Sequence, residues 1–597
     1  MEEKEQEKHK PNKILDSSIN FIFSNNPLKW LLLITILGAF LRFLMARNVS
    51  ALGDEMVHGP HAIGFLHSGL ISTIAHSPLW FYLTDIFFKI LGVTMFSTRF
   101  LSFFYGTLSI LVIYLIASKI FSRKIALISS FLISISYFTI RYTLAEMDIS
   151  AIFFLLMAIY FFIDSSEKNK FPYLAAICIG IASLIKTLSL FFVPAFLIAF
   201  FLFRKNEEKM NKKEFIGISK KVIYFGILVL LIFSPILINN YLWYKDKGMV
   251  DTYFAQYFNI GKAREAYSGQ LGYDSGFLFK RFFEGTVKMS IHLFKNDPII
   301  FILGILGIIT SFFILEKKYW IFLTSFQLFG FFFLILTNWL PTHYTTMMPV
   351  LTLFGGFFID NIINKFQNIN YKKTLFIFLA LIFIFQIYLL LPHLTSRCGI
   401  CQMRDYAEEN MDKNSIVIAD ARIYRGRIAW LFYDFHYLES SFFPEIMSVN
   451  QNLSGQQYPL KVYFVECVKD DCGWGTVREG PLNQSSEELI RIFSDVSTPI
   501  KTIYGGGGYE DDSGMPYMNI YSATININPQ IIGLIDSTHD WFYYPVNYIP
   551  KEKIFEQYSV YGFLDNLMYL FAWLIIIISI VLALAFPIKL VSDLINT

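Results

Sequence analysis

Apolar runs of membrane-spanning length recur along this chain and constrain its fold more than any other feature. The sequence predicts a polytopic α-helical membrane protein with about twelve transmembrane helices, since each helix needs about 20 mostly apolar residues. We place the spans at 29–46, 98–121, 125–141, 149–163, 172–186, 187–203, 221–240, 298–315, 319–337, 345–362, 374–392 and 563–588. The run at 172–203 can also be read as one long, kinked helix.

The composition agrees with this class. Of 597 residues, 54% are apolar and 16% are charged, whereas soluble domains are about 45–50% apolar and about 25% charged. The net charge of +3 does not indicate a nucleic-acid partner. We read residues 1–13 as a solvated leader, so the first apolar run is expected to be an uncleaved span.

Basic residues in the short loops predict the orientation, because cytoplasmic loops are enriched in Lys and Arg. With the N-terminus inside, the basic loops at 122–124, 165–170, 204–221, 316–318 and 364–373 all face the cytoplasm. The large segments then face outward, namely loops 47–97 and 241–297 and a block at 393–562. We therefore expect a transmembrane domain over 1–392, an extracytoplasmic soluble domain over 393–562, and a last helix with a cytoplasmic tail over 563–597.

The outer segments have local structure of their own. Within the first outer loop, 56–69 and 79–91 read as short amphipathic helices that lie in the membrane interface. The block at 393–562 contains strand candidates at 415–420 and 460–466 and a helix candidate at 404–411. This order of helices and strands predicts a small α/β or α+β domain inserted before the last span.

Four of the five cysteines lie in this outer block, at Cys398, Cys401, Cys467 and Cys472. Two disulfides are the preferred interpretation, because an extracytoplasmic compartment is oxidising. Three pairings are open. A zinc site of four cysteines is the alternative, although the spacing of the last two is loose for it.

Ionisable residues near the outer ends of the spans are the candidates for chemistry, because charge at membrane depth is costly and usually functional. Carboxylates there can deprotonate a hydroxyl, and cations can hold a phosphate. The carboxylate candidates are Asp54, Glu55, Glu146 and Asp148, and the cationic candidates are Arg99, Arg141, Lys186 and His343. We expect the bundle to bring them to one outer crevice.

Each candidate also has a structural interpretation. Asp54, Glu146 and Asp148 can cap helices, and Arg141 can be an interface anchor whose charged end reaches toward water. His58, His61 and His67 are spaced to share a helix face, where solvation of a polar face is favoured over a metal site.

Several short motifs, taken in order, resemble the GT-C superfamily of polyprenyl-phosphate-sugar-dependent glycosyltransferases, in particular the protein O-mannosyltransferase and lipid A aminoarabinose transferase branch. The stretch 76–83 reads HSPLWFYL, which is similar to the HPPLxYxL pattern of that branch. The other similar stretches are 53–55, 98–102, 141–148, Lys186, and 343–344 with Pro349. The resemblance covers roughly 30–360. Ser77 departs from the pattern, and 393–562 has no counterpart.

The resemblance implies an inverting transfer of a sugar from a polyprenyl (dolichyl or undecaprenyl) phosphate to a protein, lipid or glycan acceptor. Asp54 would be the general base, and Glu55, Asp148 or Glu146 would share the role of base or orient the acceptor. Arg141, Lys186, His343 and Arg99 would bind the donor phosphate, and His76 and Tyr82 would belong to the acceptor loop. No cofactor is required in this branch. A divalent metal is not indicated, although the wider superfamily has metal-dependent members.

Other functions remain open. An oligosaccharyltransferase is a neighbouring class, but its WWDxG signature is absent from the sequence. A secondary transporter usually has internal repeats, and none is evident here. A non-catalytic membrane scaffold is a third alternative. A prokaryotic plasma membrane is preferred over the endoplasmic reticulum as the location, with the active site outside the cytoplasm.

Overall fold

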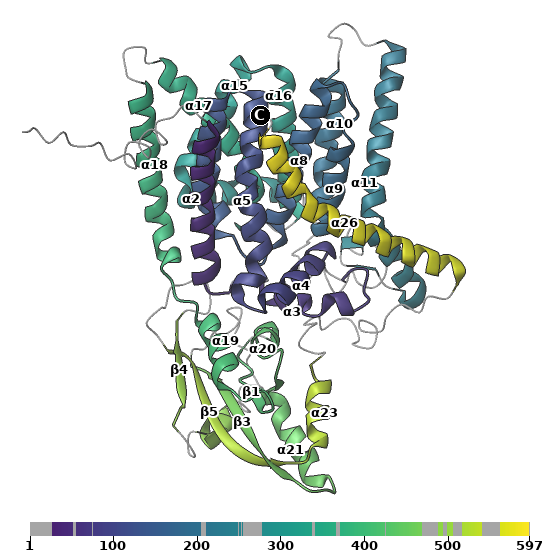
Figure 1. Cartoon of the computed structure of the whole chain (residues 1–597), viewed down its shortest axis with the longest axis vertical. Helices are drawn as coiled ribbons and strands as arrows, with labels where there is room; N and C mark the ends of the chain where they lie inside the picture. Colours follow the sequence, from purple (N-terminus) through teal and green to yellow (C-terminus); the bar gives the residue numbers. More distant parts are fainter. Residues whose placement is uncertain are drawn as a thin grey trace, which may run out of the picture.

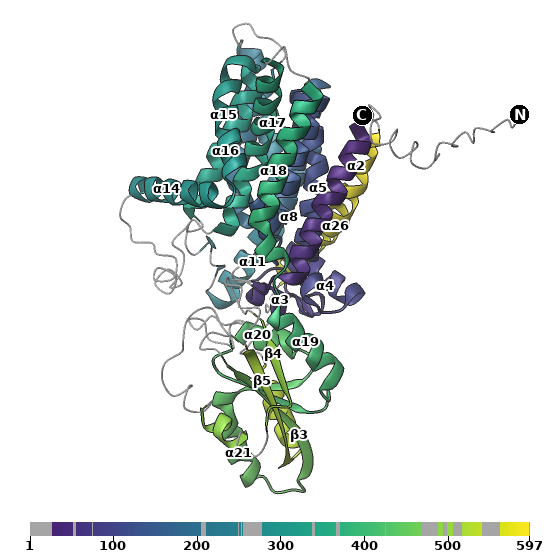
Figure 2. The same cartoon turned by 90° about the vertical axis from the view of Figure 1, so that its left-hand side faces the viewer.

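The computed structural model has two bodies, a helical bundle and a smaller sheet body beside one end of it (Figures 1 and 2). The sheet body is formed by residues that follow α18 (Tyr371–Leu394) and precede α26 (Phe563–Ile595). The structure describes residues 27–51, 55–73, 76–204, 211–248, 250–251, 253–254, 278–336, 341–365, 371–423, 425–468, 487–493, 498–505, 516–539 and 562–595. Asp54 lies outside the described residues.

Seven described helices are long and apolar enough to cross a membrane. They cover Pro27–Asn48, Met95–Ile120, Met147–Glu167, Lys212–Asp246, Pro341–Lys365, Lys373–Leu394 and Phe563–Ile595. Shorter apolar helices cover Tyr173–Ile185, Thr187–Leu202 and Pro298–Ile314. The chain is therefore a multi-pass helical membrane protein, and the count of about twelve spans stays a prediction.

The bundle contains these long helices together with shorter helices and 3₁₀ turns. In the numbering of Figure 1, the bundle consists of α2 (Pro27–Asn48), α5 (Met95–Ile120), α6 (Arg123–Ile135), α7 (Tyr137–Arg141), α8 (Met147–Glu167), α9 (Tyr173–Ile185), η2 (Thr187–Phe192), α10 (Val193–Leu202), α11 (Lys212–Lys247), α14 (Leu278–Asn296), α15 (Pro298–Ile314), α16 (Lys317–Leu336), η3 (Pro341–Met347), α17 (Met348–Lys365), α18 and α26. Helix α14 lies across the bundle, within the segment that we expected to be a loop (Figure 2).

One predicted span is interrupted, and the predicted boundary between the spans at 172–186 and 187–203 falls at a break in the helix. The span predicted at 125–141 divides at Ser136 into α6 and α7. The buried guanidinium of Arg42 donates to the carbonyls of Ile133 and Ser134 at 3.1 and 3.2 Å, and so satisfies the end of α6. The run at 172–203 breaks at Lys186, whose backbone is extended between α9 and η2. This break places a lysine at a helix end.

The loop at 47–97, which the sequence predicts on the outer side and which we call the first outer loop, contains the predicted short helices. Helix α4 (Leu79–Leu91) has the predicted bounds, which confirms that prediction. The segment 56–69 divides into α3 (Glu55–Ala62) and the 3₁₀ turn η1 (Phe65–His67), because Gly64 adopts a left-handed conformation with φ of 72°. The Asp85 carboxylate accepts from the backbone of Gly64 and Leu66, at 3.2 and 2.9 Å. Helix α4 thus holds the turn that ends α3.

The sheet body contains five strands in the order β2-β1-β3-β5-β4. Strand β1 is parallel to β2 and β3, while β5 is antiparallel to β3 and β4. The predicted strands at 415–420 and 460–466 correspond to β1 and β3. The elements are α19 (Gly399–Asn410), β1 (Ile416–Ala419), α20 (Arg425–Leu431), β2 (His436–Glu439), η4 (Ser440–Phe442), α21 (Phe443–Asn452), β3 (Tyr458–Cys467), β4 (Lys501–Tyr504), β5 (Pro516–Ile527) and α23 (Gln530–Ser537).

The cysteines favour disulfides over zinc. Cys398 and Cys401 are joined by a disulfide, and Cys467 is also disulfide-bonded. Cys472 lies outside the described residues. Because a zinc site of four cysteines needs four free thiolates, the bond between Cys398 and Cys401 contradicts it and selects one of the three pairings.

Helix α26 returns to the bundle after the sheet body. It packs against α11, α4 and α5. The Tyr105 hydroxyl donates to the carbonyl of Ala583 at 3.2 Å, and the Tyr569 hydroxyl donates to the carbonyl of Gly69 at 2.9 Å. The last helix therefore supports the outer loop as well as the bundle.

Candidate functional site

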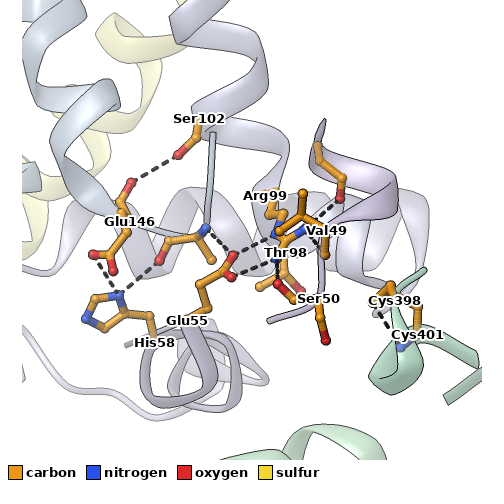
Figure 3. A network of polar contacts seen from close by, with 12 residues as sticks. Val49, Ser50, Glu55, His58, Thr98, Arg99, Ser102, Glu146, Cys398 and Cys401 are labelled. Atoms are coloured by element: carbon orange, nitrogen blue, oxygen red, sulfur yellow. Dashed lines mark hydrogen bonds and ion pairs between the residues drawn. A yellow bond between two sulfur atoms is a disulfide. The ribbon is translucent and has the colours of Figure 1, made fainter. Parts of the chain in front are cut away.

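Glu55 opens α3 and is paired with Arg99 from α5. The Glu55 carboxylate accepts two hydrogen bonds from the Arg99 guanidinium, both 2.7 Å long. It also accepts from the backbone N–H of Ala145 at 2.7 Å. Both charged side chains are fully buried. Figure 3 shows the Glu55 carboxylate turned toward Arg99.

Arg99 also fixes the end of α2. Its guanidinium donates to the carbonyls of Ala46 and Val49, at 3.0 and 2.7 Å, and to that of Ser50 at 3.0 Å. A bidentate pair with these further bonds is geometrically rigid. Arg99 therefore holds the chain on both sides of the Asp54 position. Arg99 and Glu55 thus form an ion pair with each other, and neither charged group is turned toward a substrate.

Glu146, just before α8, faces a histidine pair. The Glu146 carboxylate lies 3.9 Å from His58 Nδ1, and that nitrogen lies 3.0 Å from the carbonyl of Ala145. His58 Nε2 lies 3.3 Å from Nε2 of His76. A carbonyl oxygen only accepts, so His58 carries its proton on Nδ1. When both rings are neutral, His76 then donates through Nε2 and keeps a lone pair on Nδ1.

Burial of the loop histidines lowers the pKa of His76 and His61. Burial lowers the pKa of His76 well below its usual value, and the charges of His58, His61 and Lys186 lower it further. Burial, with a smaller effect of His58, lowers the pKa of His61 to about 3. The predicted solvation of a shared polar face is wrong for His58, which is 3% exposed. His67 is exposed as predicted, but it lies on η1 and not on the helix that carries His58 and His61.

Asp148, Lys186 and His343 form the second polar centre. Lys186 Nζ lies 2.7 Å from each carboxylate oxygen of Asp148. His343 Nδ1 lies 3.0 Å from Asp148 Oδ1 and 3.2 Å from Lys186 Nζ. The three come from the first turn of α8, the break after α9, and η3. All three are buried. The structure thus brings together residues that are 195 positions apart in sequence.

Arg141 ends α7 and is 4% exposed. Its Nη1 has no hydrogen-bond partner within the part of the chain that the structure describes. Its guanidinium carbon lies 5.9 Å from the centre of the Tyr142 ring. A buried guanidinium nitrogen without a partner is costly. An anion would supply that partner.

The two residues predicted for the acceptor loop, His76 and Tyr82, have different surroundings. The Tyr82 hydroxyl donates to the carbonyl of Leu70, and the ring packs against Trp573. Beside His76, the Ser77 hydroxyl contacts the Thr187 hydroxyl at 2.7 Å and donates to the carbonyl of Ser183 at 3.1 Å. The outer loop is therefore tied directly to the segment around Lys186, whereas Tyr82 serves the packing of α4.

The candidate site thus has two adjoining centres around the start of α8. The sequence identified Glu146, Asp148, Lys186 and His343 from charge near the membrane boundary. It missed the buried role of His58, for which residue spacing gave no signal. Within the described residues, no group of three or more His, Cys, Asp or Glu side chains has the arrangement of a metal site.

Comparison with known proteins identifies the fold. Residues 75–239 match a family model described as dolichyl-phosphate-mannose-protein mannosyltransferase. The chain is similar to ArnT from Cupriavidus metallidurans bound to undecaprenyl phosphate, with 10% identity, 83% of this chain and 98% of that chain covered, and a TM-score of 0.50. The chain is also similar to an apo oligosaccharyltransferase from Archaeoglobus fulgidus, with 13% identity, 82% of this chain and 80% of that chain covered, and a TM-score of 0.48. No curated protein matches the chain.

The resemblance to the GT-C superfamily is confirmed by the family match and by the ArnT-like fold. The matched segment includes Arg141, Asp148 and Lys186. Together these findings indicate a membrane-bound glycosyltransferase of the GT-C type.

Proposed function

We propose that this protein transfers a sugar from a polyprenyl phosphate donor to a protein, lipid or glycan acceptor, with inversion at the sugar carbon. The observation that supports this most directly is the buried cluster of Lys186, His343 and Asp148 close to the outer loop. Such a cluster is suited to a phosphate that gains negative charge as the sugar leaves.

The phosphate site would be formed by Lys186, His343 and Arg141. Asp148 accepts two hydrogen bonds from Lys186 and so fixes the direction of its ammonium group. Arg141 adds a buried guanidinium with an unfilled donor. The ArnT structure contains undecaprenyl phosphate. We extend that class of lipid to this chain as the proposed donor, because the same fold here offers buried cations.

Asp54 is the proposed general base, since it directly precedes Glu55 in the chain and Glu55 is occupied by Arg99. The base takes the proton of the acceptor hydroxyl or amine as the acceptor attacks the sugar carbon. The bond from that carbon to the phosphate oxygen breaks, and the lipid phosphate leaves with its electron pair. Glu55 and Arg99 act as positioning residues, and His76 is proposed to orient the acceptor through Nδ1.

The setting of the reaction belongs to the same proposal. The bundle is proposed to have about twelve spans, with the crevice and the sheet body outside the cytoplasm of a prokaryotic cell. The basic loops predicted on the opposite side support this orientation. No cofactor is proposed. We expect a chelator to leave the rate unchanged.

Purified protein incubated with radiolabelled prenyl-phosphate sugars, one sugar at a time, tests the proposal. Asp54→Asn should lower the transfer rate by about 10²- to 10⁴-fold, as expected for loss of a general base. Lys186→Met should weaken donor use, whereas Lys168→Met, which removes a lysine exposed at the other end of α8, should not. Transfer that survives Asp54→Asn unchanged would show that the base is another residue. A chain that uses only lipid pyrophosphate oligosaccharides would instead be an oligosaccharyltransferase.

A further inference from the structure

Helix α20 of the sheet body is seated on α3, the helix that begins with Glu55 (Figures 1 and 2). The contact centres on Trp430, which is fully buried. Its indole Nε1 donates a hydrogen bond to the Thr98 hydroxyl at 3.1 Å. Because α20 follows β1, the carboxyl end of that parallel strand faces the bundle.

Gly59 makes this close contact possible. A Cβ atom on Gly59 would lie 3.2 Å from Cδ1 of Trp430 and 3.1 Å from Cγ2 of Thr98. These distances are shorter than ordinary carbon contacts of about 3.5–4.0 Å. Helices α3, α5 and α20 therefore meet so closely that a methyl group on Gly59 would press on both Trp430 and Thr98.

The contact adjoins the candidate site on both sides. Thr98 directly precedes Arg99, which holds Glu55. Gly59 lies four residues after Glu55 on α3, so the two lie on the same face of the helix. A shift of Trp430 would therefore move α3 and the arginine clamp together.

A second tie joins the sheet body to the end of α2. The Asn48 side-chain amide donates to the carbonyl of Leu394 at 2.5 Å. The Ser396 hydroxyl donates to the carbonyl of Asn48 at 3.1 Å. The start of the chain between Asn48 and Glu55 is thus held by the end of α18 and by Ser396, and α3 beyond it is held by α20.

We propose that Trp430 is a positioning residue that sets the position of α3, and thereby of Glu55 at its start, for transfer. This inference rests on the proposed function. It assigns to the sheet body a part in the rate of transfer that acts through α3.

Three substitutions test the contact. Trp430→Phe keeps an aromatic ring and removes the indole donor. Thr98→Val removes the acceptor oxygen, whereas Thr98→Ser keeps it. Gly59→Ala pushes against the same contact from α3. The control is Phe464→Leu, which loosens a separate apolar cluster of the sheet body around Phe493.

Trp430→Phe, Thr98→Val and Gly59→Ala should each lower kcat on the order of tenfold, since small displacements of reacting groups slow catalysis strongly. The KM for the donor should stay within about twofold, because the phosphate cations are untouched. Thr98→Ser and Phe464→Leu should keep the wild-type kcat, even where the melting temperature falls. A lower melting temperature with an unchanged kcat in Trp430→Phe, or a rise in acceptor KM alone, would overturn the inference.

Hydrogen exchange of the α3 amides provides a readout that does not need activity. Trp430→Phe and Gly59→Ala should speed exchange over 55–62, and Phe464→Leu should not. Unchanged exchange in the first two variants contradicts the inference. If the wild-type protein transfers no sugar, the proposed function fails, and hydrogen exchange still decides whether Trp430 positions α3.

Discussion

The pair formed by Glu55 and Arg99 shows how strongly single residues constrain this site. Each charged group is fully buried, and the other supplies its opposite charge and two of its hydrogen bonds. Removing one member leaves an uncompensated buried charge, which typically costs about 3–5 kcal/mol. Arg99→Met should therefore lower the free energy of unfolding by about that amount, measured by denaturant unfolding in detergent.

The double variant Glu55→Gln with Arg99→Met is the matched comparison. It removes both charges, so part of the lost stability should return. If Arg99→Met unfolds at the wild-type denaturant concentration, the pair does not hold the outer loop together.

A second effect at the residue scale concerns pH. Burial lowers the pKa of His61 to about 3 in the folded protein, whereas the unfolded chain keeps the ordinary value of about 6.5. Below pH 6.5, His61 therefore binds a proton in the unfolded chain, whereas it stays unprotonated in the folded chain until the pH approaches 3. Stability is fully present above pH 6.5 and falls as the pH drops toward 3, by at most about 1.4 kcal/mol per pH unit for this group.

Thermal unfolding at pH 7 and at pH 5 measures this effect. The wild-type protein should melt at a lower temperature at pH 5, and His61→Asn should narrow the difference between the two conditions. If the variant shows the same difference in melting temperature as the wild-type protein, other groups cause the pH dependence. His76 is one such group, because its pKa is also lowered.

At the scale of elements, the bundle depends on glycines where helices cross. A Cβ on Gly307 of α15 would overlap the backbone carbonyl of Phe354 on α17. Small residues at crossings let membrane helices approach closely. Gly307→Ala should destabilise the protein by about 1–3 kcal/mol, as overpacking does.

Gly226 offers the control for this substitution. A Cβ on Gly226 would meet nothing within 4 Å. Like Gly307, Gly226 lies within a helix, α11. Gly226→Ala should therefore leave the melting temperature unchanged or raise it slightly. Equal losses in both variants would show that the crossing of α15 and α17 is not tightly packed.

The elements also show what the sequence could and could not predict. Helix α4 was predicted to the residue, because Pro78 and Gly92 bound a strongly amphipathic stretch. The break between α6 and α7 was missed, because Arg42, the side chain that satisfies the freed carbonyls, is distant in sequence. Lys186 was identified by its charge within an apolar run. Its partnership with Asp148 and His343 depends on packing that no local pattern shows.

At the scale of the whole molecule, the class of fold could be predicted from the lengths of the apolar runs and the spacing of the basic loops. The strands β1 and β3 were also visible as apolar stretches. Their mutual register was not visible, nor was the seating of α20 on α3, because both depend on contacts between segments more than 40 residues apart. Sequence pattern thus predicted the elements, and the structure was needed for the connections between them.

The return of α26 sets an order in time. All candidate site residues precede residue 344, yet α4 rests against α26, which is synthesised after all of them. The Tyr569 hydroxyl and the Trp573 ring of that helix hold Gly69 and Tyr82 of the first outer loop. We therefore expect a nascent chain, or one truncated before residue 563, to lack a finished outer loop. Synthesis through α26 then comes before activity.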